Sequence, residues 1–518
     1  MTAAVAPALP TLARRAEGSP DGPVYVGLDL GTSGLKGVAL TGSGHVVARG
    51  IGTYATRRDV PGWAEQEPAD WLDALRSVVG QLDANVPCER WASIGLAGMI
   101  PTLVLVDEEG KPTGAAITWE DSRAEEQARR FRADAGAARL YAKTGQWVDA
   151  RYLLPMLAWL SEHEPARVAP ARSMLGAKDY LYLWLTGRSA TDPSTATGYG
   201  CYDLGAGAWD PGLARAAGLR DPGMLPDVLP STAVLPLGTE AAASLGIRPG
   251  IPVALGGADS VLGLLGMGAT EPGRVAWIWG SSCVILGVGA ESIRDPAHRY
   301  LVTPLAGIGG WGLEMDLVSA GSAVGWLAAT LDLGEPSPGE RAEAILSLAA
   351  RGPIGAGGVS FLPFLGVGEQ GARWDPSLRG TLLGLSLSHG PAEIARALVE
   401  GILLESRRCV EVLDEAGLPH APIVIAAPTG SARLLSRLVA DATGREVAWS
   451  PDEPLFSAVG AAMIAAIGIG PRVRATWPSE RVTPDPRAVR AWSSLAARHE
   501  SLVRWAHHIY GTPAGKGR

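Results

Sequence analysis

An aspartate lies inside an apolar stretch near the start of the chain and is followed by a polar turn. The stretch 24–40, VYVGLDLGTSGLKGVAL, holds Asp29 and then Gly31, Thr32 and Ser33. A Gly-Thr-Ser turn between two strands exposes successive backbone N–H groups and hydroxyls, and such a concavity binds phosphate oxygens. At the end of the first strand, Asp29 is placed to hold a magnesium ion through water beside those phosphates. Taken alone, Asp-x-Gly-Thr is more typical of an ordinary hairpin turn.

A second stretch, half a chain later, has the same pattern. Residues 275–289, VAWIWGSSCVILGVG, form an apolar strand, a Gly-Ser-Ser turn at 280–282 and another apolar strand. Two strand–turn–strand units at this separation predict a duplicated domain with equivalent hairpins. Ile278 stands where the first stretch has Asp29, so only one half supplies a carboxylate. This asymmetry is expected of a nucleotide site between two duplicated domains.

A second carboxylate, Asp259, follows two glycines in a third stretch, GIPVALGGADSVLGLLGMGA, residues 250–269. The pattern predicts a strand that ends at the glycines and a helix that begins at Asp259. A carboxylate with such small neighbours can meet a bulky substrate and take the proton of its hydroxyl while a phosphoryl group is transferred. The alternative role is a helix N-cap, which Asp commonly fills. Both roles are compatible, because a capping aspartate can keep one oxygen free.

Strands and helices alternate along the rest of the chain, so the sequence predicts a mixed α/β fold. At 518 residues the chain is too long for one core, and two domains of about 250 residues are expected. Helical spacing is found at 71–82, 138–145, 150–163, 177–187, 390–417, 431–444 and 457–470, and apolar strands at 91–107 and 421–427. The small residues of the segment 457–470 suit close helix packing.

Composition excludes several classes of function. A net charge of −8, with only five lysines among the 45 basic residues, argues against a general nucleic-acid binder and against a polybasic membrane patch. No apolar run is long enough to cross a membrane. The four cysteines lie far apart, without the spacing of a zinc or redox motif, which favours a reduced, cytoplasmic protein. Residues 1–23 read as a disordered leader and 511–518 as a frayed tail.

Taken together, the motifs resemble those of the FGGY family of carbohydrate kinases, most closely its xylulokinase-like members, over residues 24–470. An ordered series of segments carries the resemblance: GLDLGTSGLKGVAL, PGWAEQEPADW, AAITWEDSR, KDYLYLWLTGRSATDPSTATGYGCYDLGAGAWD, GGADS, WGSSCV, GEQGARWDPSLRGTLLGLSLSHGPAEIARALVEG and LVADATGREV. The resemblance implies two ribonuclease H-like domains of the actin and hexokinase type, at 24–268 and 269–510. It also implies that ATP, Mg²⁺ and a sugar or polyol bind in a cleft between them.

The resemblance assigns roles to individual residues. It makes Asp259 the catalytic base and Asp29 the magnesium-associated aspartate. The residues that it places around the nucleotide are Asp29, Gly31, Thr32, Ser33, Lys36, Gly280, Ser281, Ser282, Gly430 and Ser431. Those that it places around the acceptor are Met99, Trp119, Asp121, Asp259 and Ser260. Trp119 has two interpretations, a sugar-stacking face or a core aromatic, and the nearby Asp121 favours the first. Glu369 and Arg373 are interpreted as a structural ion pair.

Three departures from the family pattern bear on specificity. Xylulokinase-like enzymes usually carry Met-His-Gly where this chain has Ile-Pro-Thr at 100–102, and Pro101 cannot replace the hydrogen bond of that histidine. Ser260 follows the catalytic aspartate where Asn is usual. Residues 427–432, APTGSA, stand for Gly-Gly-Gly-Ala-Arg-Ser, so Ala427 and Pro428 are expected to crowd the close approach of adenosine. Gly430 and Ser431 restore part of that approach at the helix start.

The resulting prediction is an ATP-dependent kinase of a small sugar or polyol, and D-xylulose is not expected to be its standard substrate. The rival is a catalytically weak relative that binds sugar or nucleotide as a regulatory protein, which the altered loops favour. An actin-like polymerising or chaperone ATPase would not need the Trp119–Asp121 segment. A homodimer is compatible with the sequence but is not required by it.

Overall fold

A six-stranded sheet forms the centre of the first half of the molecule. The computed structural model describes residues 22–332, 338–366, 371–375, 377–451 and 455–511, so most of the expected leader and tail lies outside the described residues. The strand order is β13 (Val234–Pro236), β14 (Pro252–Ala258), β5 (Trp91–Gly98), β1 (Val24–Leu30), β2 (Gly34–Thr41) and β3 (Val46–Thr53). β1, β2 and β3 are antiparallel neighbours, whereas β5 and β14 continue the sheet in parallel.

A seven-stranded sheet in the second half repeats this arrangement. Its order is β17 (Leu301–Pro304), β18 (Trp311–Leu317), β16 (Cys283–Gly289), β15 (Val275–Trp279), β21 (Ile423–Ala426), β22 (Val447–Trp449) and β23 (Glu480–Val482). β15, β16 and β18 are antiparallel, and β21 and β22 follow β15 in parallel, as β5 and β14 follow β1. The prediction of a duplicated domain with equivalent hairpins is therefore confirmed.

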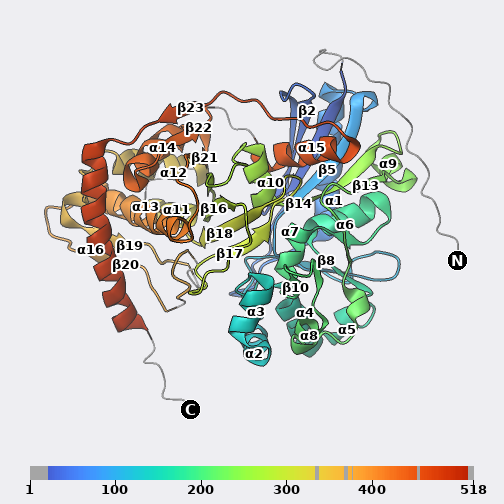
Figure 1. Cartoon of the computed structure of the whole chain (residues 1–518), viewed down its shortest axis with the longest axis horizontal. Coiled ribbons are helices and arrows are strands. Elements are labelled where there is room, and N and C mark those ends of the chain that lie inside the picture. Colours follow the sequence, from blue (N-terminus) through green and yellow to red (C-terminus); the bar gives the residue numbers. More distant parts are fainter. Residues whose placement is uncertain (1–21, 333–337, 367–370, 376, 452–454, 512–518) are drawn as a thin grey trace.

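Two helices lie between the sheets, and they come from different halves of the chain (Figure 1). α10 (Asp259–Gly266) follows β14 directly, while α15 (Phe456–Ile469) packs on β1 and β5 of the first sheet and on α10. The approach is so close that a Cβ on Gly27 would lie 1.8 Å from the carbonyl oxygen of Ala458. A Cβ on Gly460 would likewise lie 1.9 Å from that of Leu262. The predicted close packing of the small-residue segment is confirmed.

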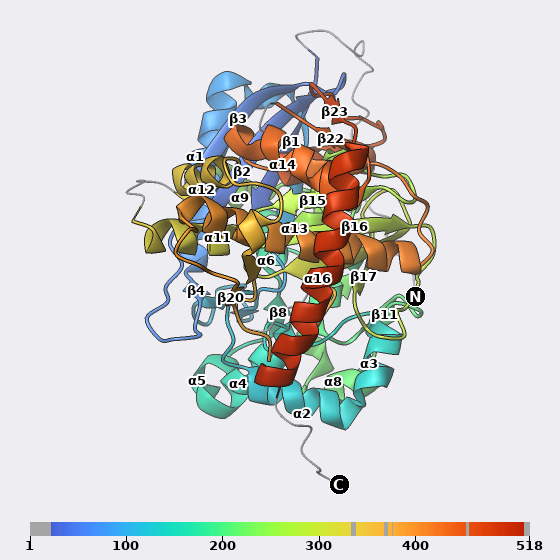
Figure 2. The same cartoon turned by 90° about the vertical axis from the view of Figure 1, so that its left-hand side faces the viewer.

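The outer faces of the sheets are covered by amphipathic helices. On the first domain these are α1 (Pro68–Asn85), α6 (Ala177–Thr186) and α9 (Thr239–Leu245). On the second they are α11 (Gly321–Thr330), α12 (Pro338–Ala349), α13 (Pro391–Glu415), α14 (Thr429–Thr443) and α16 (Pro486–Tyr510). α16 runs along the outside of the second domain (Figure 2). Within the described part of the chain, no helix is both long and apolar enough to cross a membrane.

A small lobe extends from the first sheet. Its helices are α2 (Glu125–Ala135), α3 (Ala137–Thr144), α4 (Leu153–His163), α5 (Pro165–Val168), α7 (Pro193–Ala196) and α8 (Pro211–Ala216). Its short strands are β4 (Glu65–Gln66), β6 (Val104–Val106), β7 (Ala116–Ile117), β8 (Ser173–Leu175), β9 (Ala190–Thr191), β10 (Tyr202–Asp203), β11 (Ala208–Trp209) and β12 (Asp227–Val228). In the second domain, the short strand β19 (Ser360–Leu362) pairs with β20 (Thr381–Leu383). The lobe reaches the second domain, because Gln146 Nε2 donates to Val302 O at 2.9 Å.

Candidate active site

The turn between β1 and β2 is held in place by side chains from three other segments. Gly31 N donates to Gly34 O at 3.1 Å, and the Tyr54 hydroxyl donates to Gly31 O. Gln66 Nε2 donates to Thr32 O at 2.7 Å, and Trp119 Nε1 donates to Thr32 Oγ1 at 2.9 Å. These contacts fix the backbone of the turn before any ligand binds, as an electrostatic binding site requires.

The turn between β15 and β16 is supported in a different way. Gly280 N donates to Ser282 O at 2.8 Å, which closes the turn. Ser322, at the start of α11, donates to Ser281 O from its backbone N at 3.0 Å and from its hydroxyl at 3.1 Å. The neighbouring Gly321 fits only as glycine, because a Cβ there would lie 2.1 Å from Gly280 O. Sequence reasoning missed this supporting helix.

Asp29 is a buried carboxylate with one unused oxygen. Its side chain is 7% exposed, and Oδ1 has no hydrogen-bond partner. Burial raises its pKa, although Lys36, its cross-strand neighbour on β2, opposes the shift. An unpaired buried oxygen beside a phosphate-type turn fits a magnesium ion bound through water. Among the described residues no three His, Cys, Asp or Glu side chains form a metal cluster, so such an ion would take its other ligands from phosphate and water.

Asp259 is the first residue of α10, and the N-cap is Ala258. The interpretation of Asp259 as the N-cap is therefore wrong, because no side chain caps this helix. One carboxylate oxygen instead accepts the backbone N–H of Ser260 at 2.8 Å. Burial and then the charge of Asp29 raise the pKa of Asp259 to about 7, against the opposing effects of the Ser260 N–H and Lys36. A carboxylate with this pKa suits a general base at neutral pH.

Two further carboxylates reach this region from β18 of the second domain. Glu314 and Asp316 alternate along the strand and so share one face of the sheet. The Ser260 hydroxyl donates to Glu314 Oε2 at 3.1 Å, which joins the two domains beside Asp259. Burial, then Asp316 and Asp259, hold the pKa of Glu314 well above its usual value. Sequence reasoning missed both residues, although two acids within an apolar strand are the same signal that singled out Asp29.

A salt bridge from the lobe completes the polar surroundings. Arg151 Nη2 lies 2.6 Å from a carboxylate oxygen of Asp149. Burial raises the pKa of Asp316 to about 6, Arg151 opposes this shift, and Asp149 adds to it. One oxygen of Asp316 is buried without a hydrogen-bond partner. We call Asp29, Asp259, Glu314 and Asp316 the carboxylate cluster.

The expected acceptor residues do not all meet at the cluster. Trp119 is half-buried against the first-domain core, as the core interpretation expects, and its indole N–H holds the first turn; the sugar-stacking interpretation stays a prediction. Met99 follows β5, and its side chain is buried in the same core. Ser260 lies in the cluster region beside Asp259. Pro101 lies two residues after Met99, in the loop between β5 and β6.

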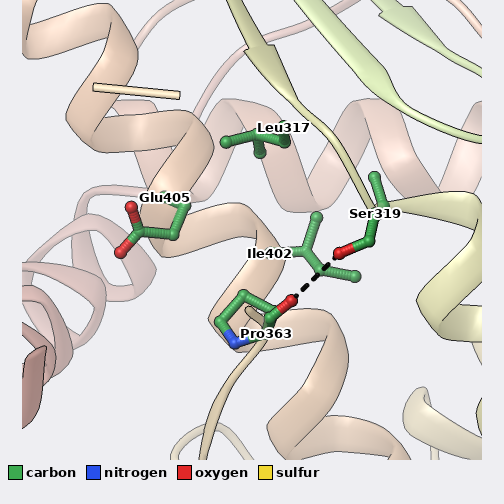
Figure 3. A pocket seen from close by; sticks show the side chains of 6 residues that line it. Leu317, Ser319, Pro363, Ile402 and Glu405 are labelled. Atoms are coloured by element: carbon green, nitrogen blue, oxygen red, sulfur yellow. Dashed lines mark hydrogen bonds between the residues drawn. The ribbon is translucent and has the colours of Figure 1, made fainter. Parts of the chain in front are cut away.

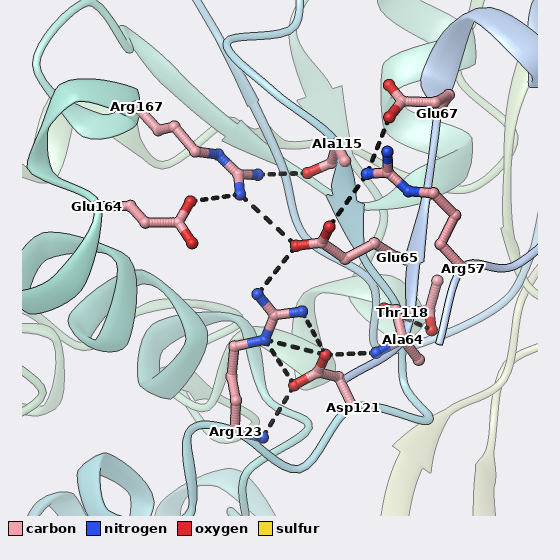
Figure 4. A network of polar contacts seen from close by, with 10 residues as sticks. All are labelled: Arg57, Ala64, Glu65, Glu67, Ala115, Thr118, Asp121, Arg123, Glu164 and Arg167. Atoms are coloured by element: carbon pink, nitrogen blue, oxygen red, sulfur yellow. Dashed lines mark hydrogen bonds and ion pairs between the residues drawn. The ribbon is translucent and has the colours of Figure 1, made fainter. Parts of the chain in front are cut away.

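Asp121 belongs to a separate ion-pair network (Figure 4). Its carboxylate is 1% exposed, accepts Ala64 N at 2.7 Å and pairs with Arg123 at 2.7 Å. Arg123 also pairs with Glu65 at 2.9 Å, and its guanidinium lies 3.7 Å from the centroid of the Trp63 ring. Both Asp121 oxygens are engaged in this network, so the structure does not bring this carboxylate into the cluster with Asp259.

The expected adenosine loop follows β21. Pro428 is the N-cap of α14, and its carbonyl accepts Ser431 N at 2.9 Å. Ser431 is buried, whereas Gly430 is exposed. A Cβ on Gly430 would lie 2.8 Å from a carboxylate oxygen of Glu343, on α12. An acid therefore stands beside the helix start at which adenosine is expected.

Arg373 forms ion pairs within the second domain. It contacts Glu405 at 2.9 Å and also Glu500, whereas its predicted partner Glu369 lies outside the described residues, so that pair stays a prediction. Burial opposes ionisation of Glu405, but the charge of Arg373 and the hydrogen bond from His499 outweigh it and lower its pKa to about 2. Glu405 lines a cavity with Leu317, Ser319, Pro363 and Ile402 (Figure 3). At about 10 Å³ this cavity has room for one water molecule, so it is not a substrate site.

Two domains of one topology, each with a supported phosphate-type turn, and a base-like carboxylate between them define a two-domain phosphotransferase. The model of the FGGY family of carbohydrate kinases, N-terminal domain, matches residues 24–266. That of the C-terminal domain matches residues 275–469. The chain belongs to the FGGY family of carbohydrate kinases.

Several relatives act on different acceptors, according to their names. The xylulose kinase of Klebsiella pneumoniae is 29% identical over 86% of this chain and 90% of its own length. The glycerol kinase of Aromatoleum aromaticum is 30% identical over 93% of this chain and 97% of its own. A gluconokinase of Bacillus licheniformis is 27% identical over 73% of this chain and 74% of its own length. The crystal structure of xylulose kinase from Rhodospirillum rubrum matches 94% of this chain and 100% of its own, with 32% identity and a TM-score of 0.84.

Proposed function

We propose that this carbohydrate kinase transfers the γ-phosphoryl group of ATP to a hydroxyl of a small, uncharged sugar or polyol. One observation carries the proposal: Asp259, with a pKa of about 7, stands beside Asp29 and across from Glu314 of the other domain. This arrangement supplies a base for the acceptor hydroxyl next to a turn that suits phosphate.

Each part of the site has one task in this mechanism. The backbone N–H groups of the two turns hold the phosphates of ATP. Asp259 takes the proton of the acceptor hydroxyl while the hydroxyl oxygen attacks the γ-phosphorus. ADP leaves with the electron pair of the broken P–O bond. Mg²⁺, when bound near Asp29, neutralises part of the phosphate charge. The Ser260–Glu314 hydrogen bond keeps the second domain against the base and limits access of water.

The charge around the base favours an uncharged acceptor. Acidic side chains outnumber basic ones here, with Asp29, Asp259, Glu314, Asp316 and Asp149 against Lys36 and Arg151, and Asp316, with a pKa of about 6, is mostly ionised at neutral pH. The cation on the acceptor side, Arg151, is already paired with Asp149. A sugar acid would place its carboxylate among like charges, which costs about 3 kcal/mol for one pair at roughly 5 Å and an effective dielectric constant of about 20.

Matched acceptors test the proposal. ADP release is measured with xylitol against xylonate, and with glucitol against gluconate, at saturating Mg²⁺ and ATP. We expect the uncharged member of each pair to have the larger kcat/KM, by about 100-fold. Better turnover of the sugar acids would overturn the proposed acceptor class. If no acceptor releases ADP while calorimetry shows that sugar binds, the chain is a binding protein of this family and the proposed chemistry is wrong.

A further inference from the structure

A buried group of charges lies outside the carboxylate cluster, and the proposed mechanism does not use it. Lys178 and Asp179 lie in the first turn of α6, and Asp192 is the N-cap of α7. The Lys178 ammonium lies 2.5 Å from Asp179 and 3.1 Å from Asp192, and all three side chains are at most 1% exposed. Because burial of charges costs several kcal/mol per ion, hydrophobic residues would serve a purely structural core at least as well.

A short chain of hydrogen bonds connects this group to the base. One oxygen of Asp192 accepts the backbone N–H of Ser194 at 2.9 Å and its hydroxyl at 2.5 Å. The same hydroxyl oxygen accepts the N–H of Ala258 at 3.0 Å. Ala258 is the residue directly before Asp259. Asp192 therefore fixes the orientation of the Ser194 hydroxyl, and the hydroxyl oxygen in turn holds the peptide N–H directly before the base Asp259.

β14 is irregular directly before Ala258. The pairing of β14 with β5 shifts register between Ala254 and Gly257, and Gly256 has a φ of +76°. A Cβ on Gly256 would lie 1.6 Å from the carbonyl oxygen of Leu96, so this bulge requires glycine. The Ala258 N–H donates to the Ser194 hydroxyl, so Ser194 supports the peptide from which α10 starts.

The charged group also packs against the ends of both strands. A Cβ on Gly98, at the end of β5, would lie 2.8 Å from Cβ of Lys178. A Cβ on Gly257 would lie 2.9 Å from Oγ of Ser194. Since Ala258 and Gly98 are register partners, Lys178 and Ser194 support neighbouring strand ends. Ser457 of α15 holds the opposite side of the junction, donating to Asp259 O at 3.0 Å.

We infer that Ser194 is a positioning residue for the general base, held by the buried Lys178–Asp192 pair. It fixes the peptide before Asp259 and thereby sets the distance from the carboxylate to the acceptor hydroxyl. The inference rests on the proposed function, because it assumes that Asp259 takes the proton. A displacement of about 1 Å at a reacting group costs on the order of 100-fold in rate. Ser194→Ala is therefore expected to lower kcat by about 10- to 100-fold, with the KM for ATP within twofold.

The matched control is Ser93→Ala. Ser93 is also fully buried, and its hydroxyl also makes one hydrogen bond to a backbone group, donating to Ala465 O at 2.8 Å. Both variants lose a buried serine hydroxyl, so both should lose about 1–3 kcal/mol of stability. Only Ser194→Ala should lose turnover. Equal kcat in the two variants would overturn the inference, since loss of stability would then account for everything.

A double variant separates this inference from the proposed function. Ser194→Ala is added to Asp259→Asn, and the two losses in kcat are compared. If Ser194 acts through the base, the second substitution has little further effect; if both losses multiply in full, Ser194 acts independently and the inference fails. Near wild-type kcat in Asp259→Asn alone would instead refute the base. If Ser194→Ala does not fold, Ser194→Cys is the second test, because cysteine is of similar size and its sulfur is a weaker hydrogen-bond acceptor. We expect kcat to be lower in Ser194→Cys as well. An unchanged kcat in Ser194→Cys would count against the inference.

Discussion

Replacement of Asp259 by asparagine tests the centre of the mechanism. Asn keeps the shape of the side chain, and its amide oxygen can still accept the Ser260 N–H that Asp259 accepts at 2.8 Å. It cannot take a proton at neutral pH. Loss of a general base typically removes about 10²–10⁴-fold of the rate, so we expect kcat of Asp259→Asn to fall by that amount. The affinity for ATP, measured by calorimetry, should stay within a fewfold of wild type.

The pH dependence gives the same experiment a second readout. Burial and the charge of Asp29 raise the pKa of Asp259 to about 7, so the base is protonated below neutral pH. In the wild type, kcat/KM should rise about tenfold between pH 6 and pH 8 as the carboxylate loses its proton. In Asp259→Asn this rise should disappear, and the residual rate should be flat across the range. A wild-type rate that falls over this range would contradict the role of Asp259 as base.

The free energy of unfolding provides a third readout. Asp259→Asn should raise it if Asp259 is a base of raised pKa, and should lower it if the role of Asp259 is structural. The folded-state pKa of Asp259, about 7, is above its ordinary value of 3.8, so the native state holds the proton more tightly than the unfolded state. This contribution to stability is complete below pH 4 and is lost as the pH rises through 7. At pH 8 the wild type carries a charged carboxylate near Asp29, which Asn removes. Since the side chain is partly exposed, we expect the free energy of unfolding of Asp259→Asn to exceed that of the wild type by about 1–2 kcal/mol at pH 8 and by roughly a third of that at pH 5. A kcat within tenfold of wild type at pH 8, or a clear loss of stability there, would refute the reasoning.

Four further predictions concern the rest of the site. Asp29→Asn should raise the Mg²⁺ concentration for half-maximal rate by about 10- to 100-fold, because the residue holds the ion through water; an unchanged Mg²⁺ titration would exclude that role. Glycines at Ala427 and Pro428 should lower the KM for ATP severalfold without changing the acceptor KM, whereas tight ATP binding before the change would show that another loop holds the adenine. D-xylulose should bind poorly, because Pro101 lacks a side-chain donor and a missing hydrogen bond costs about 1–3 kcal/mol, or roughly tenfold or more in affinity; efficient turnover at micromolar D-xylulose would contradict this. Arg123→Ala should cost about 3–5 kcal/mol of stability and lower the Tm, because it breaks a buried ion pair, and the acceptor KM should stay unchanged, because this pair lies outside the carboxylate cluster. A raised acceptor KM with an unchanged Tm would place the Asp121–Arg123 pair in the acceptor site.

Local motifs were enough to predict the fold and two of the carboxylates. Each hairpin carries its own signal, a polar turn between apolar strands, and the repetition of the signal predicts the duplication that the two sheets show. Asp29 and Asp259 stand out because each is an acid at the end of an apolar strand. The small-residue segment that forms α15 predicts close packing, and the glycine contacts with β1 and α10 confirm it. These features depend on neighbours in sequence, which a single chain displays directly.

Features that depend on distant contacts could not be predicted. The sequence favours Asp121 as an acceptor residue because it is two residues from Trp119, but its partners Arg123 and Ala64 belong to a pair that only the folded lobe brings together. The N-cap interpretation of Asp259 fails by one residue, which lies within the uncertainty of any helix start derived from sequence. The contact between Ser260 and Glu314 spans 54 residues and two domains, so no local pattern announces it.

The cost of the carboxylate cluster is itself an argument for its function. Acids buried close together are unfavourable in a folded protein. Besides burial, Asp29 and Asp316 raise the pKa of Asp259, and Asp316 and Asp259 raise that of Glu314. Oxygens of Asp29 and Asp316 also remain buried without partners. Elsewhere in the described chain buried acids are compensated, as Glu405 is by Arg373 and His499. The difference matters because a sequence that agrees with its fold at every other level is expected to break the rules mainly where it binds or reacts. Phosphates, Mg²⁺ and acceptor hydroxyls would supply the missing partners, and so the uncompensated acids mark the place where a ligand completes the structure.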